Sequence, residues 1–288
     1  SKIAKSKVKV VLSGDGGDEL FGGYNRYLYA NKYWKIINFI PVKYRSFIFN
    51  LSSKIPDKLF LQILNLFASK SLHSKIHLSK INKIKNKLKN LNSESNFYYS
   101  LITEWDKNSD IFNFDNSDNF DFKNILNNFQ NKNIGIEQKM MEADLKTYLP
   151  DDILCKVDRS SMNYSLEARS PYLSKKLINL SFSIPTKYKI KNGITKIILR
   201  DILSKYLPKE LSNMPKKGFS IPINKLLNNE LSDWKNDVLS KSICDSHQLF
   251  DYNVIKKLQS DHSNGYSNNE YKLWSIIQFN DWYISNHL

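Results

Sequence analysis

The sequence predicts an α/β fold that is mostly helical by length, and three observations lead to this prediction. An apolar run, VKVVL, reaches Leu12 and has the residues of a short strand. A turn that holds five of the chain's nine glycines comes next, with the sequence SGDGGDELFGGY. Most of the remaining chain has the spacing of amphipathic helices. A strand, a glycine-rich turn and a helix in succession are a common way to aim backbone N–H groups at a phosphate.

The first strand is expected over Val8, Val10, Val11 and Leu12, in the pattern of a buried parallel strand. Such a strand needs neighbours on both sides, and few similar runs occur later in the chain. We therefore expect its sheet partners to precede residue 1, so that the chain is a C-terminal fragment. A helix is expected to open at or after Asp18, to be interrupted at Gly22 and Gly23, and then to continue.

Helical patterns dominate the chain beyond this turn. They are expected over residues 57–92, from Ile136 to a stop at Pro150, from Asp151 through Arg169, over residues 193–207, and from Asn269 in an aromatic segment packed in the core. We divide residues 1–288 into a strand and turn (1–30), a helical region (31–106), a variable segment rich in Asn and Asp (107–134) and a second helical region (135–288).

Composition limits the class of protein. The formal net charge is +15, but the lysines are interleaved with Asn and Ile, as in residues 79–92. This pattern favours a codon bias over a nucleic-acid surface, so no nucleic-acid partner is expected. The two cysteines form no motif for a disulfide framework or zinc, and no apolar run approaches the ~20 residues of a membrane helix. We expect no membrane partner and a cytoplasmic location.

The acids of the glycine-rich turn raise a question of charge. Asp15 and Asp18 are three residues apart and converge if the turn curls like a helix start. Two carboxylates repel a phosphate unless a cation lies between them, and Mg²⁺ favours a few carboxylates together with phosphate oxygens. The alternative is a structural turn whose acids favour the helix start. The spacing alone leaves the two interpretations open.

Two further places carry charge in a suggestive pattern. Asp152 and Lys156 share a helix face at i,i+4, which on its own favours a solvated ion pair. Lys196 comes shortly after a glycine near a helix start, where a cation opposes the helix dipole, and this indicates an anionic ligand. The five histidines have no catalytic context and are expected on the surface.

Four motifs occur in an order that resembles a known family: SGDGGDELFGGY, YLPDDILCKVDRSSMNYSLEARSPYL, GITKIILRDIL and PKKGFSIP. The chain is similar to the C-terminal synthetase domain of glutamine-hydrolysing asparagine synthetases. The resemblance implies an adenine-nucleotide alpha-hydrolase-like (ATP-pyrophosphatase) fold with a parallel sheet. It also implies ATP and Mg²⁺ as cofactors. In the family, the β-carboxylate of aspartate attacks the α-phosphorus of ATP, and glutamine-derived ammonia then displaces AMP from β-aspartyl-AMP.

The resemblance also assigns roles to residues of this sequence. Ser13, Gly14, Gly16 and Gly17 resemble the backbone segment that contacts ATP, and Asp18 resembles the carboxylate that holds Mg²⁺ and pyrophosphate. Three residues resemble catalytic groups: Asp15, where many members have Glu; Asp152, in the acyl-transfer pocket; and Lys196, at the α-phosphate and pyrophosphate. Ser174 stands where the family's RxPFLD pattern ends in an acid.

The resemblance implies parts that this sequence lacks, namely a second ATP loop, SGGxDS, and a glutaminase domain with an N-terminal Cys. Both are expected upstream, so the fragment alone is expected to have neither synthetase nor glutaminase activity. Other interpretations stay open: an amidotransferase acting on a sugar, a peptide or a β-lactam precursor, a non-catalytic binding protein, and, more weakly, a basic nucleic-acid binder. A homodimer also stays open.

Overall fold

The computed structural model of the chain describes residues 1–45, 47, 51, 55–56, 59, 91–105, 109–114, 127–131, 133–212 and 221–287. The chain divides into two compact units, one formed by residues 1–39 and 121–217 and the other by residues 40–120 and 218–288. Three predictions fall largely outside the described residues: the helical stretch at 57–92, the variable segment at 107–134 and the PKKGFSIP loop.

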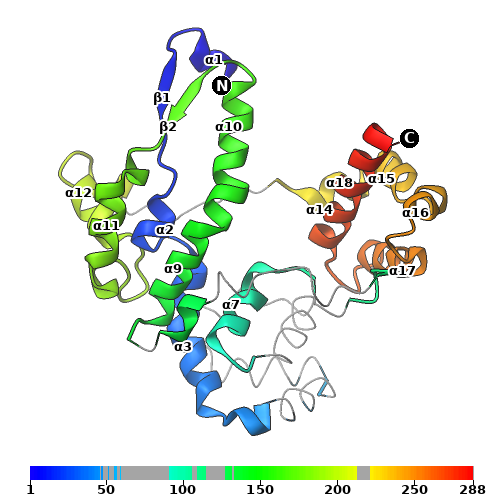
Figure 1. Cartoon of the computed structure of the whole chain (residues 1–288), viewed down its shortest axis with the longest axis horizontal. Helices are drawn as coiled ribbons and strands as arrows, with labels where there is room; N and C mark the ends of the chain where they lie inside the picture. Colours follow the sequence, from blue (N-terminus) through cyan, green and yellow to red (C-terminus); the bar gives the residue numbers. More distant parts are fainter. Residues whose placement is uncertain are drawn as a thin grey trace. The chain divides into compact units, whose positions relative to one another are not determined.

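The predicted fold class is confirmed, since the structure is mostly helical and contains a small parallel sheet (Figure 1). Strand β1 (Val10–Leu12) pairs in parallel with β2 (Glu167–Arg169), with Val11 opposite Ala168. Within the described residues Val10 is 38% and Leu12 73% exposed, and the further sheet neighbours that we expect before residue 1 stay a prediction. With a single partner strand among these residues, the apolar side chains of β1 stay accessible.

The glycine-rich turn leads into two helices, as expected. Helix α2 (Gly17–Phe21) is preceded by Gly16 and followed by Gly22, both with left-handed backbone, and α3 (Asn25–Phe39) continues after the break. The interruption therefore lies where the sequence predicts it. Leu20 and Phe21 are buried, which anchors α2 in the core of the first unit.

The region around Pro150 differs from the prediction. Helix α9 (Ile136–Lys146) is followed by a π-helical turn, η3 (Leu149–Leu154), and then by α10 (Cys155–Met162). Helix α9 stops earlier than predicted, since the backbone leaves helical geometry at Thr147 with a φ of −128° and a ψ of −78°. Pro150 lies in the first turn of η3, where a residue without an N–H is tolerated, so the predicted helix start at this proline is confirmed. The predicted helix is also wrong over Glu167–Arg169: Ser165 has a φ of 51°, which turns the chain out of α10 and into β2.

The remaining elements of the first unit are short. They are α1 (Lys2–Lys5), η2 (Asn127–Gln130), η4 (Pro171–Leu173), α11 (Lys175–Ser183), η5 (Thr186–Tyr188), α12 (Ile197–Leu203) and α13 (Lys209–Ser212). Helix α12 confirms the helix predicted after Gly193. Helix α11 packs against α2 and η4, and α12 also contacts α2. Segments far apart in the sequence therefore meet around the glycine-rich turn.

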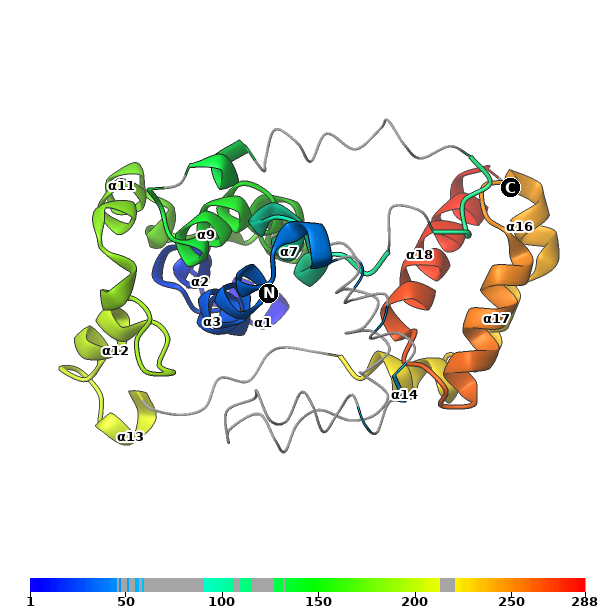
Figure 2. The ribbon, with the colours of Figure 1, turned by 90° about the horizontal axis from the view of Figure 1, so that it is seen from below.

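The second unit is helical in its described residues. It contains α7 (Glu94–Ile102), α14 (Ile223–Asn228), α15 (Ser232–Val238), α16 (Lys241–His247), α17 (Tyr252–Ser263) and α18 (Glu270–His287). Figure 2 shows α18 beside α16 and α17, and the buried side chains of α18 are Leu273, Ile276, Ile277 and Asn280.

Two predictions about the second unit need correction. Helix α18 forms as predicted, and Trp274 packs partly buried against the core, but core packing is wrong for Tyr271 and Trp282, which are 45% and 52% exposed because they lie off the face that carries Ile276. His262 is 5% exposed, so it is not a surface residue; its Nδ1 accepts a hydrogen bond from the N–H of Asn269. None of the described helices has the length and apolar character needed to cross a bilayer.

Candidate functional site

The turn after β1 is held by the segment that comes after β2. The N–H of Ser13 donates to the carbonyl of Arg169 at 2.9 Å, which extends the parallel pairing by one residue. The hydroxyl of Ser170 donates to the carbonyl of Asp15. The RSPYLS motif thus braces the SGDGGDE motif, although more than a hundred residues separate them. The side chain of Asp15 is partly exposed.

The glycines of the turn have different surroundings. Gly16 has a φ of 84°, and a Cβ there would lie 2.4 Å from Cδ2 of Leu173. Gly17 lies against the ring of Tyr172, which is 3.4 Å from the position of a Cβ. Gly14 is exposed, and no other atom of the described residues beyond its chain neighbours lies within 4 Å of the position of its Cβ. Packing therefore explains Gly16, whereas the space beside Gly14 is open to a ligand.

Two of the predicted site residues meet directly. Nζ of Lys196 lies 3.0 Å from Oδ1 of Asp18, and the side chains are 30% and 27% exposed. Asp18 is in the first turn of α2, and Lys196 is the N-cap residue of α12 with a left-handed backbone, φ 55°. The contact between α12 and α2 brings these opposite charges together beside the glycine-rich turn.

The third predicted group, Asp152, lies in the π-helical turn η3. Its Oδ1 is 3.8 Å from Nζ of Lys156, which confirms the predicted i,i+4 pair. Both side chains are at least half exposed, so the pair is worth ~0–1 kcal/mol. Asp152 therefore pairs with a residue one turn along the same helical segment, whereas Asp18 pairs with Lys196 of another helix.

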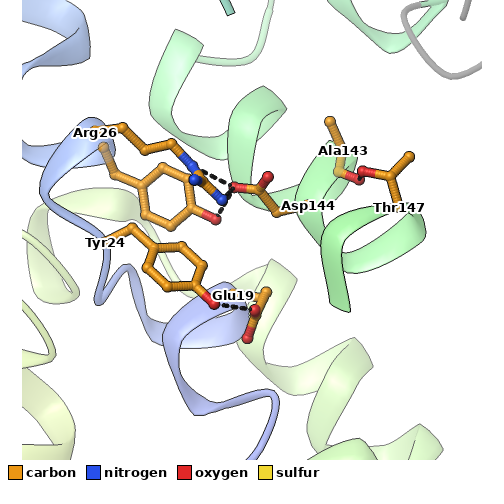
Figure 3. A network of polar contacts seen from close by, with 7 residues as sticks. Glu19, Tyr24, Arg26, Ala143, Asp144 and Thr147 are labelled. Atoms are coloured by element: carbon orange, nitrogen blue, oxygen red, sulfur yellow. Dashed lines mark hydrogen bonds and ion pairs between the residues drawn. The ribbon is translucent and has the colours of Figure 1, made fainter. Parts of the chain in front are cut away.

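A buried polar network that the sequence did not predict lies behind the turn (Figure 3). The hydroxyl of Tyr24 donates to Oε1 of Glu19 at 2.6 Å. Arg26 donates from Nε to Oδ2 of Asp144 at 2.9 Å, and its Nη2 is 2.8 Å from the same oxygen. The hydroxyl of Tyr27 also donates to Asp144. Since Glu19 and Asp144 are 1% and 0% exposed, these contacts supply the polar partners that buried carboxylates need.

Aromatic rings extend this network toward the π-helical turn. The guanidinium carbon of Arg26 lies 4.4 Å from the ring centre of Tyr24 and 5.1 Å from that of Tyr148. Burial raises the pKa of Tyr148, and the nearby carboxylate of Asp152 raises it further. Burial also raises the pKa of Glu19, although the Tyr24 hydroxyl opposes that shift. The network therefore links Glu19, the residue after Asp18, with Tyr148 at the start of η3, which is the turn that carries Asp152.

The donor set limits how a metal ion would bind. Within the described ranges, no group of three or more His, Cys, Asp or Glu side chains is arranged to hold a metal. Asp18 supplies a single carboxylate that water can reach. This donor set suits Mg²⁺, which is often held by one or two carboxylates together with phosphate oxygens of a substrate.

Comparisons with known proteins agree with these motifs. A profile of the asparagine synthase family matches residues 1–284. The glutamine-hydrolysing asparagine synthetase 1 of Bacillus subtilis strain 168 is 30% identical over 293 residues, which cover 99% of this chain and 42% of that protein. A putative glutamine-hydrolysing asparagine synthetase of Mycobacterium tuberculosis strain H37Rv is 27% identical over 292 residues, or 98% of this chain and 40% of that protein. The chain thus spans less than half the length of these curated relatives. No solved structure matches it.

Proposed function

The chain belongs to the asparagine synthase family, and from this premise we propose that it forms part of an ATP-dependent amide-forming ligase that converts aspartate to asparagine with ammonia from glutamine. In this proposal the chain is the C-terminal part of the synthetase domain. We also propose that a glutaminase domain and the second ATP loop lie in parts of the complete polypeptide outside this chain, which covers 42% of the Bacillus subtilis relative.

The observation that carries the proposal is the ion pair of Asp18 and Lys196 beside the glycine-rich turn. The reaction brings two anions together, the carboxylate of aspartate and the triphosphate of ATP, so the site must supply positive charge. We assign Lys196 to the α-phosphate and the pyrophosphate, and Asp18 to Mg²⁺. When bound, Mg²⁺ supplies a Lewis acid that stabilises charge on the departing pyrophosphate. The pair keeps both side chains at the site before any ligand binds, which lowers the cost of ordering them.

The turn supports the same assignment. We assign the backbone of Ser13, Gly14, Gly16 and Gly17 to contact with ATP, and the open space beside Gly14 favours close approach of a ligand. Asp15 lies on the same turn and is assigned to the aspartyl-adenylate step. Its side chain is one methylene shorter than the Glu of many family members, so the reacting group must come nearer to the turn.

Asp152 is assigned to the pocket where ammonia displaces AMP. It lies in a π-helical turn, a feature frequently found at functional sites. Tyr148 and Arg26 connect this turn with the network behind Asp18. The proposal therefore treats the two carboxylates as parts of one site that are held by a shared buried scaffold.

The experiment uses the complete polypeptide of which this chain is a part, with ATP, Mg²⁺, glutamine and candidate acceptors. Aspartate is expected to yield pyrophosphate, AMP and asparagine in equal amounts, and this chain alone is expected to yield none. Release of pyrophosphate from this chain alone would contradict the fragment assignment. Release from the complete polypeptide with a sugar or peptide carboxylate, and none with aspartate, would instead favour the related amidotransferases.

A further inference from the structure

The chain reverses direction directly after α2. Gly22 has a φ of 70°, which ends the helix, and the N–H of Gly23 donates to the carbonyl of Asp18 at 2.8 Å. The fold-back places the buried Gly23 beside the first turn of α2. The backbone of Gly23 itself is outside the left-handed region, so its conformation does not require glycine.

The space around Gly23 leaves no room for a Cβ unless the Asp18 or Lys196 side chain moves. A Cβ built there would lie 1.8 Å from Oδ1 and 2.8 Å from Cγ of Asp18. It would also lie 2.3 Å from Cε of Lys196. The oxygen that a Cβ would meet is the same Oδ1 that pairs with Nζ of Lys196. The ion pair therefore fills the volume that any other residue needs for its first side-chain atom.

We propose that Gly23 is a positioning residue that permits the Asp18–Lys196 pair to form across its bare Cα. The role of this pair in catalysis rests on the proposed function, but the steric claim does not. Any side chain at position 23 has to displace the carboxylate, the lysine stem, or both. The two charges then separate while the rest of the turn remains in place.

A double-mutant cycle tests the steric part. Gly23→Ala is made in the wild-type chain and in Asp18→Ala, and thermal unfolding is followed together with hydrogen exchange of residues 13–39. In Asp18→Ala the nearest obstacle is gone, and the end of a flexible lysine stem remains. We expect Gly23→Ala to lower the midpoint by less than half as much in that background as in wild type.

Gly135→Ala is the matched control, because Gly135 has a φ of −64° and its Cβ would meet a flexible carboxylate of Glu137 at 3.2 Å. This control is expected to shift the midpoint equally in both backgrounds. Equal shifts for Gly23→Ala in the two backgrounds, or failure of both Gly23→Ala variants to fold, would show that something other than the pair excludes the methyl group.

A second readout monitors the pair itself. Lysine acylation by acetic anhydride is measured residue by residue with mass spectrometry. An ammonium that donates to a carboxylate must leave it before its nitrogen reacts, so Asp18→Asn is expected to speed acylation of Lys196. The expected factor is about twofold to fivefold, as for a partly exposed ion pair.

Gly23→Ala is expected to give the same increase and Gly135→Ala none. Unchanged acylation of Lys196 in a folded Gly23→Ala chain overturns the proposal. Neither readout uses ATP. If the acylation result holds but the complete wild-type polypeptide releases no pyrophosphate with aspartate, the proposed function fails and the positioning role of Gly23 stands.

Discussion

The buried pair of Arg26 and Asp144 offers a prediction about stability. We compare Arg26→Met with Asp144→Asn, because the two substitutions remove opposite partners of one contact. Asp144 is fully buried, whereas 20% of the Arg26 side chain is exposed to water. The burial is unequal, so the two substitutions are expected to differ in cost.

The magnitudes depend on the groups that each substitution leaves behind. Arg26→Met leaves a carboxylate at 0% exposure with the Tyr27 hydroxyl as a remaining donor, and breaking a buried pair in this way costs ~3–5 kcal/mol. Asp144→Asn leaves a guanidinium that lies over the ring faces of Tyr24 and Tyr148 on a side chain that is 20% exposed, and it keeps an acceptor oxygen. Its expected cost is ~1–3 kcal/mol.

The assay is hydrogen exchange in increasing urea, read from the peptides that cover α3 and α9. A local readout is needed because the chain has two units and a single global transition is not assured. In the double variant Arg26→Met/Asp144→Asn we expect part of the loss caused by Arg26→Met to be recovered, since the buried charge is gone. Equal costs for the two single variants, or strictly additive costs in the double variant, would refute this reasoning.

Three further predictions concern single positions. Tyr24→Phe removes the donor to the buried carboxyl of Glu19, so we expect a loss of ~1–3 kcal/mol in the same exchange assay, and an unchanged first unit would contradict this. Burial lowers the pKa of His262, so its stabilising contribution is complete above its ordinary pKa of 6.5 and is lost as the pH falls through the lower folded value. The urea midpoint of the second unit is therefore expected to drop between pH 7.5 and pH 5.5, less so in His262→Asn; an equal drop in both would assign the effect elsewhere. Ser174 is the N-cap residue of α11, where Ser and Asp rank alike, so Ser174→Asp is expected to change the local stability of α11 by less than ~0.5 kcal/mol, and a change above ~1 kcal/mol in the same exchange assay would give that position another role.

Local sequence signals predicted the features that depend on local physics. Glycine adopts a left-handed backbone at little steric cost and commonly follows the end of a helix, so the sequence predicted the break at Gly22. The i,i+4 spacing likewise predicted the contact of Asp152 with Lys156. The glycine before it and the helical spacing of residues 193–207 predicted that Lys196 lies near a helix start.

Features that depend on distant contacts were not predicted. Glu167–Arg169 has no strand-like composition, and it becomes β2 through pairing with β1. Tyr24 and Glu19 are five residues apart and meet because the chain reverses at Gly22, so no helical spacing reveals the contact. Asp144, the partner of Arg26 in the same network, comes from a helix more than a hundred residues away.

The central claim is that Asp18 and Lys196 form one functional unit of an ATP site. The most direct test measures aspartate-dependent pyrophosphate release by the complete polypeptide carrying Asp18→Ala, Lys196→Ala or, as the control, Asp151→Ala. Asp151 is exposed, and its backbone N–H donates to the carbonyl of Thr147 at 2.9 Å, a contact that the substitution keeps. We predict that the first two variants release no pyrophosphate and that Asp151→Ala releases it at the wild-type rate. Near-normal release by Asp18→Ala or by Lys196→Ala would contradict the account.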